Sequence, residues 1–283
     1  MKIIVTGATG NLGTLIADHL ALSEHEVIGI DRVYRQGRPY PIRIVDLLNR
    51  DTAYEILPGV DAIVHLANHA AVNRRDEQTL LNENIAMNTN LFQAAVELGI
   101  PKILFASSIQ VMTGDRLLKD RAESPSQLSY LPLDADCPAI PGSAYGLSKY
   151  LSEEMLRYHA RSSNLQAVTI RLPFVLTERH VLRWFSKPHD HYRLDEAFCF
   201  LAGQDIGPMV EAVLKADLPG YRAYFPTNRE NLLNRPPAEL IKEYFPEVPL
   251  KVPLDQLTCL ADNSSLERET GWIAQPFDFP AES

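Results

Sequence analysis

Short apolar runs rich in β-branched residues alternate with helix-like segments through the first 175 residues of the chain. Runs this apolar are typical of strands buried on both faces, and the intervening segments repeat apolar side chains at helical spacing. The alternation predicts a parallel sheet with right-handed crossovers, which is a doubly wound α/β fold. The expected strands are Lys2–Thr6, Glu26–Asp31, Arg43–Asp46, Ala62–Leu66, Lys102–Ala106 and Ala167–Leu172, and the expected helices are Leu12–Leu22, Glu83–Leu98 and Tyr145–Ser162.

The pattern changes after Pro173. Prolines cluster between Pro219 and Pro253, and short segments replace the earlier alternation. We therefore expect residues 1–175 to form the main domain and residues 176–283 to form mainly a small lobe over the carboxyl edge of the sheet. One late strand is expected near residues 222–226 and a short helix at Pro237–Tyr244, which has proline at its start.

A glycine-rich turn, GATGNLG, joins the first expected strand to the first expected helix. Unpaired backbone N–H groups at a helix start attract an anion, and glycines let a phosphate approach the chain. Asp31 ends the second strand eighteen residues past Gly13, where a carboxylate can accept both hydroxyls of a ribose. The combination predicts a dinucleotide site. Asp31 favours NAD, whereas Arg32 beside it is able to pair with a 2′-phosphate, so NADP stays open.

Composition excludes several other classes of protein. The formal net charge is −9, and an acidic surface repels phosphate backbones, so no nucleic-acid partner is expected. No apolar run of about 18 residues occurs, and no hydrophobic leader opens the chain, so we expect no membrane span and a cytoplasmic location. The three cysteines, Cys137, Cys199 and Cys259, are far apart and are expected to be free thiols.

The stretch Thr6–Gly13 resembles the T-G-x-x-G-x-x-G turn of the extended short-chain dehydrogenase/reductase family, the NAD-dependent epimerase/dehydratase group, which has a Rossmann fold. The likeness covers residues 1–175 and fades beyond, with a trace at Leu266–Trp272. Met87 and Asn88 stand where the family has Gly-Thr. The other similar segments are Asp46-Leu47, His65-Leu66-Ala67-Asn68 (H-L-A-A in the family), Asn84-Ile85 with Asn90 (N-V-x-G-T-x-N), Ala106-Ser107-Ser108, and Tyr145-Gly146-Leu147-Ser148-Lys149 (Y-x-x-x-K).

The glycine turn and this resemblance together imply a set of cofactor contacts along the carboxyl ends of the strands. Asp46-Leu47 is expected beside the adenine ring, and Pro173 near the nicotinamide. The implied cofactor-binding residues are Gly7, Gly10, Asn11, Leu12, Gly13, Asp31, Arg32, Asp46, Leu47, Leu66, Ala67, Asn68, Asn84, Ser107, Tyr145, Lys149 and Pro173.

Tyr145 and Lys149 are four residues apart on one expected helix and therefore share a face. A free tyrosine has a pKa of about 10, and a nearby ammonium favours its phenolate form. The resemblance implies that Lys149 also holds the nicotinamide ribose and that Ser108 binds the substrate oxygen that Tyr145 protonates or deprotonates. Hydride transfer belongs to the cofactor, which the protein orients.

The substrate-binding residues are less defined. In sugar-nucleotide epimerases of the family an Asn commonly stands where this chain has Phe174. The basic stretch Glu178–Arg193 either clamps a carboxylate or phosphate of the substrate or forms a solvated lid helix. No carboxylate–histidine set accompanies its histidines, so no metal is expected. The candidate substrate residues are Asn68, Ser108, Gln110, Phe174, Arg179, Arg183 and Trp184.

The sequence thus predicts an NAD(P)-dependent oxidoreductase that acts on a sugar or a sugar nucleotide, with a homodimer expected from the family resemblance. Epimerisation and simple dehydrogenation, as in uronate dehydrogenases, use the same residues and both stay open. A cofactor-sensing regulator on the same fold is the alternative from another class. Such regulators usually lose the catalytic tyrosine, whereas Tyr145 and Lys149 are both present here.

Overall fold

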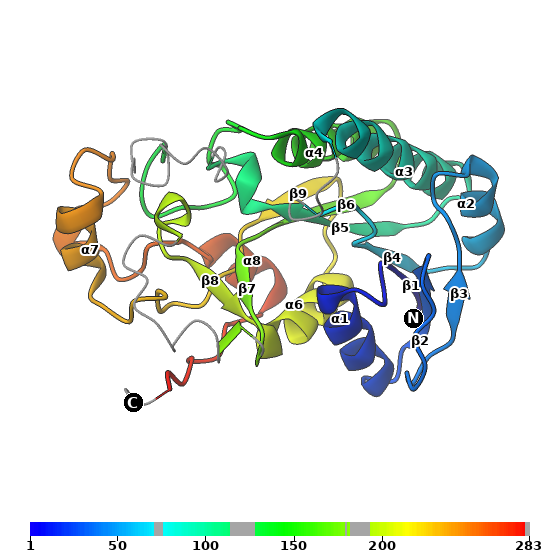
Figure 1. Ribbon diagram of the computed structural model, residues 1–283, viewed down its shortest axis with the longest axis horizontal. Helices are drawn as coiled ribbons and strands as arrows, with labels where there is room; N and C mark the ends of the chain where they lie inside the picture. The colour runs from blue at the N-terminus through cyan, green and yellow to red at the C-terminus, as the bar shows by residue number, and fades with distance from the viewer. Residues whose placement is uncertain (71–75, 114–127, 179, 182–192, 281–283) are drawn as a thin grey trace.

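A seven-stranded parallel sheet forms the centre of the computed structural model, which describes residues 1–70, 76–113, 128–178, 180–181 and 193–280 (Figure 1). The strand order is β3-β2-β1-β4-β5-β6-β9, so the chain starts in the middle of the sheet and winds outward in both directions. This arrangement confirms the predicted doubly wound fold. The strands are β1 (Lys2–Thr6), β2 (Glu26–Asp31), β3 (Ile42–Ile44), β4 (Ala62–His65), β5 (Lys102–Ser108), β6 (Gln166–Leu172) and β9 (Tyr221–Tyr224).

Helices cover both faces of the sheet (Figure 1). Successive side chains of a strand point to opposite faces, so Ile3 and Val5 of β1 pack on one layer of helices and Ile4 packs on the other. The layer against Ile4 contains α2 (Arg50–Ile56), α3 (Glu77–Glu97) and α4 (Ala144–Ser162), and the layer against Val5 contains α1 (Asn11–Leu22) and α6 (Gly203–Lys215).

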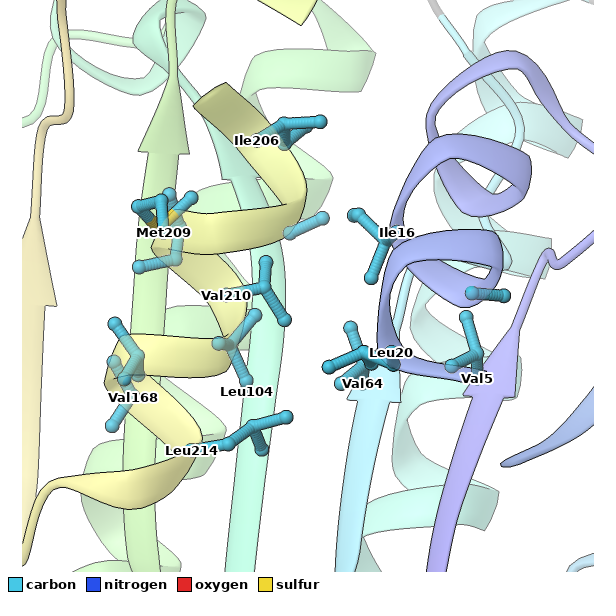
Figure 2. Close-up of a cluster of buried hydrophobic side chains, with 14 of the residues drawn as sticks. Val5, Ile16, Leu20, Val64, Leu104, Val168, Ile206, Met209, Val210 and Leu214 are labelled. Atoms are coloured by element: carbon cyan, nitrogen blue, oxygen red, sulfur yellow. The ribbon is translucent and has the colours of Figure 1, made fainter. Parts of the chain in front are cut away.

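Helix α6 is an element that the sequence patterns did not reveal. It comes from the second half of the chain and yet packs along α1 on the main sheet. Figure 2 shows Val210 of α6 and Ile16 of α1 over Val64 and Leu104 of the sheet. The approach is close, because a Cβ on Gly207 would lie 2.6 Å from the His19 side chain. Residues 203–224 therefore return to the main sheet, first as α6 and then as β9.

Most of the other described segments after residue 172 pack around a second core, whereas Leu266 and Trp272 belong to the first. Strands β7 (Phe174–Leu176) and β8 (Phe200–Ala202) form a two-stranded parallel sheet that follows the carboxyl end of β6. Phe198 and Phe200 are fully buried in this core, and α7 (Pro237–Tyr244) contributes Leu240 to it. Figure 1 shows α7 at the end of the molecule far from α2 and β3. The last helix is α8 (Ser264–Thr270), and single 3₁₀ turns occur at Ile109–Val111, Leu194–Glu196 and Leu254–Gln256.

The α1–α6 contact has a polar end that makes stability depend on pH. Glu211 of α6 accepts hydrogen bonds from His19 of α1 (2.7 Å), from Ser23 directly after α1 (3.1 Å) and from Lys215. Burial raises the pKa of Glu211, but these hydrogen bonds outweigh burial and lower the pKa to about 2. The carboxylate therefore stabilises the fold at pH values above its ordinary pKa of about 4.5. This contribution to stability is lost as the pH falls from there toward 2.

Replacing Glu211 by glutamine is expected to lower the free energy of unfolding at pH 7 by on the order of 1 kcal/mol. We expect the wild-type melting temperature to fall between pH 5 and pH 3, and the difference in melting temperature between wild type and Glu211→Gln to narrow over the same range. Calorimetric melting across this range measures both effects. The exposed Glu247→Gln is the matched control. A difference that stays constant from pH 7 to pH 3 would show that the Glu211 charge contributes nothing.

Candidate active site

The glycine turn follows β1 directly and packs against the segment after β4. Gly7 has a φ of +70°, and a Cβ there would lie 3.0 Å from the Ala67 nitrogen. A Cβ on Gly13 would lie only 2.0 Å from the Gly7 carbonyl oxygen. Gly10 caps α1 without a side-chain hydrogen bond, and the first turn of α1 contains no acidic residue. The helix start at Asn11 and Leu12 thus has no side chain of its own as a cap, which fits a cofactor pyrophosphate.

Asp31 ties the end of β2 to this turn. One carboxylate oxygen accepts the Thr9 N–H at 3.0 Å, and the other accepts the N–H groups of Arg32 (2.7 Å) and Val33 (3.3 Å). A carboxylate has about four acceptor positions, so capacity remains for a ribose hydroxyl. The side chain is therefore held beside the glycine turn, where the sequence places the ribose.

Arg35 is a basic residue that the sequence analysis did not single out. Its guanidinium donates to the Thr14 hydroxyl at 3.3 Å and so lies over the first turn of α1. It also lines a cavity of about 450 Å³ together with Asn11, Thr14 and Leu15, opposite residues 176–178 and 202–204. The signal in the sequence was the pair of arginines, Arg32 and Arg35, directly after the acidic strand end.

The expected adenine segment is braced from α3. The amide of Asn90 donates to the carbonyls of Leu47 (2.9 Å) and Leu48 (3.2 Å). Asp46 is exposed and accepts the Leu48 N–H at 3.0 Å, whereas Leu47 is buried. The backbone of this segment is therefore fixed at the carboxyl end of β3.

Tyr145 and Lys149 lie on consecutive turns of α4, whose start is capped by Ser143. Lys149 is buried, and its ammonium donates to the Ala106 carbonyl (2.7 Å) and to Asn68 Oδ1 (2.8 Å). The same nitrogen lies 5.6 Å from the centre of the Tyr145 ring. Burial lowers the pKa of Lys149 to about 7. The ammonium thus lies close enough to Tyr145 to favour a phenolate.

The two serines at the end of β5 face different partners. The Ser108 hydroxyl accepts the Gln110 N–H at 3.2 Å, at the carboxyl edge of the sheet. The Ser107 hydroxyl instead donates to Glu153 of α4 at 2.5 Å. Neighbouring side chains of a strand point to opposite faces, so only one of the two can face the cleft. The geometry therefore gives no support to a cofactor contact of Ser107.

A buried ion pair lies beneath these residues. Glu153 is fully buried on α4 and accepts three hydrogen bonds from Arg171 of β6, the shortest at 2.9 Å. Arg171 also donates to the carbonyls of Ala135 (3.0 Å) and Cys137 (2.9 Å). Hydrogen bonds to Glu153 outweigh burial and raise the pKa of Arg171. The pair joins the two strand ends, the Tyr145 helix and the segment that precedes that helix.

Asn84 joins the segment after β4 to α4. Its side chain is fully buried, accepts the His69 N–H (2.7 Å), and donates to the His69 carbonyl (3.1 Å) and the Ser148 hydroxyl (3.1 Å). It therefore braces the segment after β4 against α4, and its geometry does not support direct contact with a cofactor. The predicted Asn68 lies in that segment, with its amide oxygen on Lys149.

The described substrate candidates lie on the segments that follow β5 and β6. Gln110 accepts the Ser143 hydroxyl at 3.5 Å, and Pro173 is buried. The Phe174 ring lies 5.1 Å from the His180 ring and 4.0 Å from the guanidinium carbon of Arg193. Arg179, Arg183 and Trp184 lie outside the residues that the structure describes.

Two further features are absent from the described part of the chain. No group of three or more histidine, cysteine and carboxylate side chains there could hold a metal ion. Among the same residues, no helix has the length and apolar character needed to cross a membrane. Cys137 and Cys199 are buried free thiols, and Cys259 is a half-buried one.

A glycine turn, an acidic strand end and a Tyr–Lys helix on one doubly wound sheet define a Rossmann oxidoreductase of the short-chain type. The model of the NAD dependent epimerase/dehydratase family matches residues 3–187. The chain belongs to this family.

Two relatives illustrate its range. The chain is 28% identical over 223 residues to an L-arabinose 1-dehydrogenase (NAD(P)(+)) of Haloferax volcanii, covering 77% of this chain and 84% of that one. It is 27% identical over 193 residues to a uronate dehydrogenase of Pseudomonas syringae pv. tomato, covering 65% of each chain.

Solved structures share the fold over nearly the whole chain. A UDP-glucose 4-epimerase of Thermotoga maritima, crystallised with UDP-glucose, superposes with a TM-score of 0.73 at 18% identity, over 97% of this chain and 94% of that one. A short-chain dehydrogenase/reductase superfamily protein of Agrobacterium tumefaciens with bound NAD gives 0.70 at 18% identity, over 97% and 93%. At these identities the likeness concerns the fold.

Proposed function

We propose that this protein is an NAD(P)-dependent dehydrogenase that oxidises a hydroxyl of a free sugar or uronate. The observation that carries the proposal is the buried Lys149 ammonium beside Tyr145, on the same edge of the sheet as Ser108 and the glycine turn. Two observations favour a dehydrogenase over an epimerase. The two relatives described above are a sugar dehydrogenase and a uronate dehydrogenase, and Phe174 stands where nucleotide-sugar epimerases commonly carry an asparagine.

The residues have separate tasks in this oxidation. Ser108 orients the substrate oxygen. Tyr145, as phenolate, takes the proton of the substrate hydroxyl while a hydride leaves the carbon that bears this hydroxyl. Lys149 stabilises the phenolate through its charge. NAD, when bound, supplies the hydride acceptor. Gly7, Gly10 and Gly13 let the cofactor's pyrophosphate approach the start of α1, where Asn11 and Leu12 present backbone N–H groups.

Asp31 is the proposed ribose ligand, which favours NAD. Arg32 and Arg35 follow the same strand end, and the Arg35 guanidinium lies over the first turn of α1. NADP binding is therefore the weaker, secondary property, since a 2′-phosphate gains the guanidinium groups but faces the Asp31 carboxylate. Titration of both cofactors ranks them directly.

We further propose a cytoplasmic homodimer that associates through α3 and α4. Leu151 and Tyr158 of α4 expose 39% and 59% of their surface, which gives that helix an apolar contact face. We assign the cofactor to residues 1–175 with α6 and β9, and the substrate lobe to the other described segments after residue 175.

The test is a panel of free aldoses, uronates and UDP-sugars incubated with NAD⁺. We expect one free sugar or uronate to yield one NADH per sugar consumed, followed by absorbance at about 340 nm. An epimerase returns its hydride, so conversion of a UDP-sugar without net NADH would replace the proposal by epimerisation. Tight NAD⁺ binding without turnover of any member of the panel would favour the cofactor-sensing alternative.

A further inference from the structure

A chain of hydrogen-bonded polar side chains runs from Lys149 of α4 to β1. Its members are buried except for Asn68, which is half-buried. Asn68 accepts the Lys149 ammonium at 2.8 Å and donates to Asn88 Oδ1 at 2.7 Å. That same oxygen lies 2.7 Å from His65 Nε2, and His65 Nδ1 lies 2.6 Å from the Thr6 hydroxyl. Buried amides and imidazoles need hydrogen-bond partners, so a continuous series of hydrogen bonds of this kind holds every member in place.

The donors and acceptors in this chain allow one consistent orientation. An ammonium has only protons to give, so Asn68 must turn its oxygen toward Lys149 and its nitrogen toward Asn88. Asn88 then presents its oxygen to Asn68 and His65, and its nitrogen donates to Ser152 at 2.6 Å. Burial lowers the pKa of His65 to about 3, so this imidazole is neutral and donates from Nε2.

We propose that Asn68, held by Asn88, is a positioning residue that keeps the Lys149 ammonium charged and fixed beside Tyr145. The inference rests on the proposed function of Tyr145 and Lys149. Of the three ammonium protons, one goes to the Ala106 carbonyl and one to Asn68. The third is left for the cofactor ribose or the Tyr145 oxygen. Without Asn68 the buried ammonium keeps one described hydrogen-bond acceptor, the Ala106 carbonyl, and burial favours the neutral amine.

The charged and titratable groups around Lys149 give its ammonium little support of their own. Glu153 on α4 raises the pKa of Lys149, but Arg171 of β6 neutralises that carboxylate. His65 on β4 is neutral, and α3 contributes the amides of Asn84 and Asn88. The Phe105 ring of β5 lies 4.6 Å from the ammonium and adds a cation–π contact. The ionisation of Tyr145 then depends on how firmly Lys149 stays charged.

Asn68 and Asn88 also depart together from the motifs that the chain otherwise resembles. The related strand end reads H-L-A-A, with alanine at position 68, and the related helix has threonine at position 88. These two asparagines lie twenty positions apart in the sequence and bind one another directly. The two positions that differ from the motifs are therefore joined by one direct hydrogen bond.

The test compares Asn68→Ala and Asn68→Asp with wild type in two measurements. The first is the pH profile of kcat/KM for sugar oxidation. The second is the titration of the Lys149 amine by NMR of lysine-labelled protein, which needs no substrate. The exposed Asn82→Ala is the control. Asn68→Ala should lower the pKa of Lys149 by about one unit. The acidic limb of the profile should then move to higher pH by a similar amount, because the Tyr145 phenolate loses part of its stabilisation. Asn68→Asp should raise the pKa of Lys149.

Asn88→Ala should shift the Lys149 titration in the same direction as Asn68→Ala but less, and the double variant should shift it no further than Asn68→Ala. A folded Asn68→Ala protein with lower kcat but an unchanged pH profile and an unchanged Lys149 titration would overturn the proposal. If the wild type oxidises no sugar while the Lys149 titration still moves in opposite directions in the two variants, the proposed function fails and the positioning role stands.

Discussion

Tyr145→Phe protein is expected to bind NAD⁺ within a few-fold of wild type and to oxidise its sugar about 10³-fold more slowly. The substitution removes only the phenolic oxygen, and loss of a positioned acid–base group typically costs 10²–10⁴ in rate. The helix start and the Lys149 contacts to Ala106 and Asn68 do not involve that oxygen, so fold and cofactor binding should persist. Steady-state kinetics and fluorescence titration of NADH measure the two properties separately.

Tyr150→Phe is the matched control, because Tyr150 lies on the same helix and is similarly half-buried. It should retain nearly the full rate. If Tyr145→Phe protein keeps more than about a tenth of the wild-type rate, another group transfers the proton and the assignment of Tyr145 is wrong. Equal losses in both variants would point to damage of α4.

Gly13→Ala is expected to have the second large effect. The new Cβ would lie 2.0 Å from the Gly7 carbonyl oxygen, 2.7 Å from its carbon and 2.9 Å from the Ala8 Cα, all of them backbone atoms. The turn or the start of α1 must shift, at a cost of about 3 kcal/mol. Since about 1 kcal/mol moves the melting temperature of a chain this size by 2–4 °C, a drop of roughly 10 °C is expected.

The displaced turn should also weaken NAD⁺ binding by at least about tenfold, because the helix start carries the phosphate contact. Gly59→Ala is the control: Gly59 is exposed, has a φ of +73° and has open space around the position of a Cβ. It incurs a backbone cost of about 1 kcal/mol without a clash and should leave NAD⁺ binding unchanged. Wild-type NAD⁺ affinity in Gly13→Ala protein would contradict the placement of the pyrophosphate.

The sequence was sufficient for the sheet and for local features of the site. The run before Gly7 and the run that ends at Asp31 are apolar on both faces, which defines parallel strands irrespective of what packs on them. Tyr145 and Lys149 lie one turn apart, so their common face follows from helix geometry alone. The glycine spacing marks a close backbone approach, and the Gly13–Gly7 contact is such an approach.

Contacts between segments that lie far apart in the chain could not be predicted from the sequence. Nothing in the periodicity of residues 203–215 says that this helix packs on α1 and not on the second core, because an amphipathic face does not specify its partner. Asn68 meets Lys149 across 81 positions, and the Arg171–Glu153 pair joins a strand to a helix. The sequence also did not reveal that the Ser107 hydroxyl binds Glu153 of α4, because the direction of a strand-end side chain depends on which face the next helix covers.

The direct transfer of hydride is the central claim, and isotopic labelling tests it most directly. The sugar identified in the panel would be deuterated at the carbon that bears the reacting hydroxyl and oxidised with NAD⁺ by wild-type protein. Mass spectrometry of the reduced cofactor should then find one deuterium in the nicotinamide ring for each sugar oxidised, and Tyr145→Phe protein should form about 10³-fold less labelled cofactor over the same time. Oxidised sugar accompanied by reduced cofactor without deuterium, or by no reduced cofactor, would contradict this account.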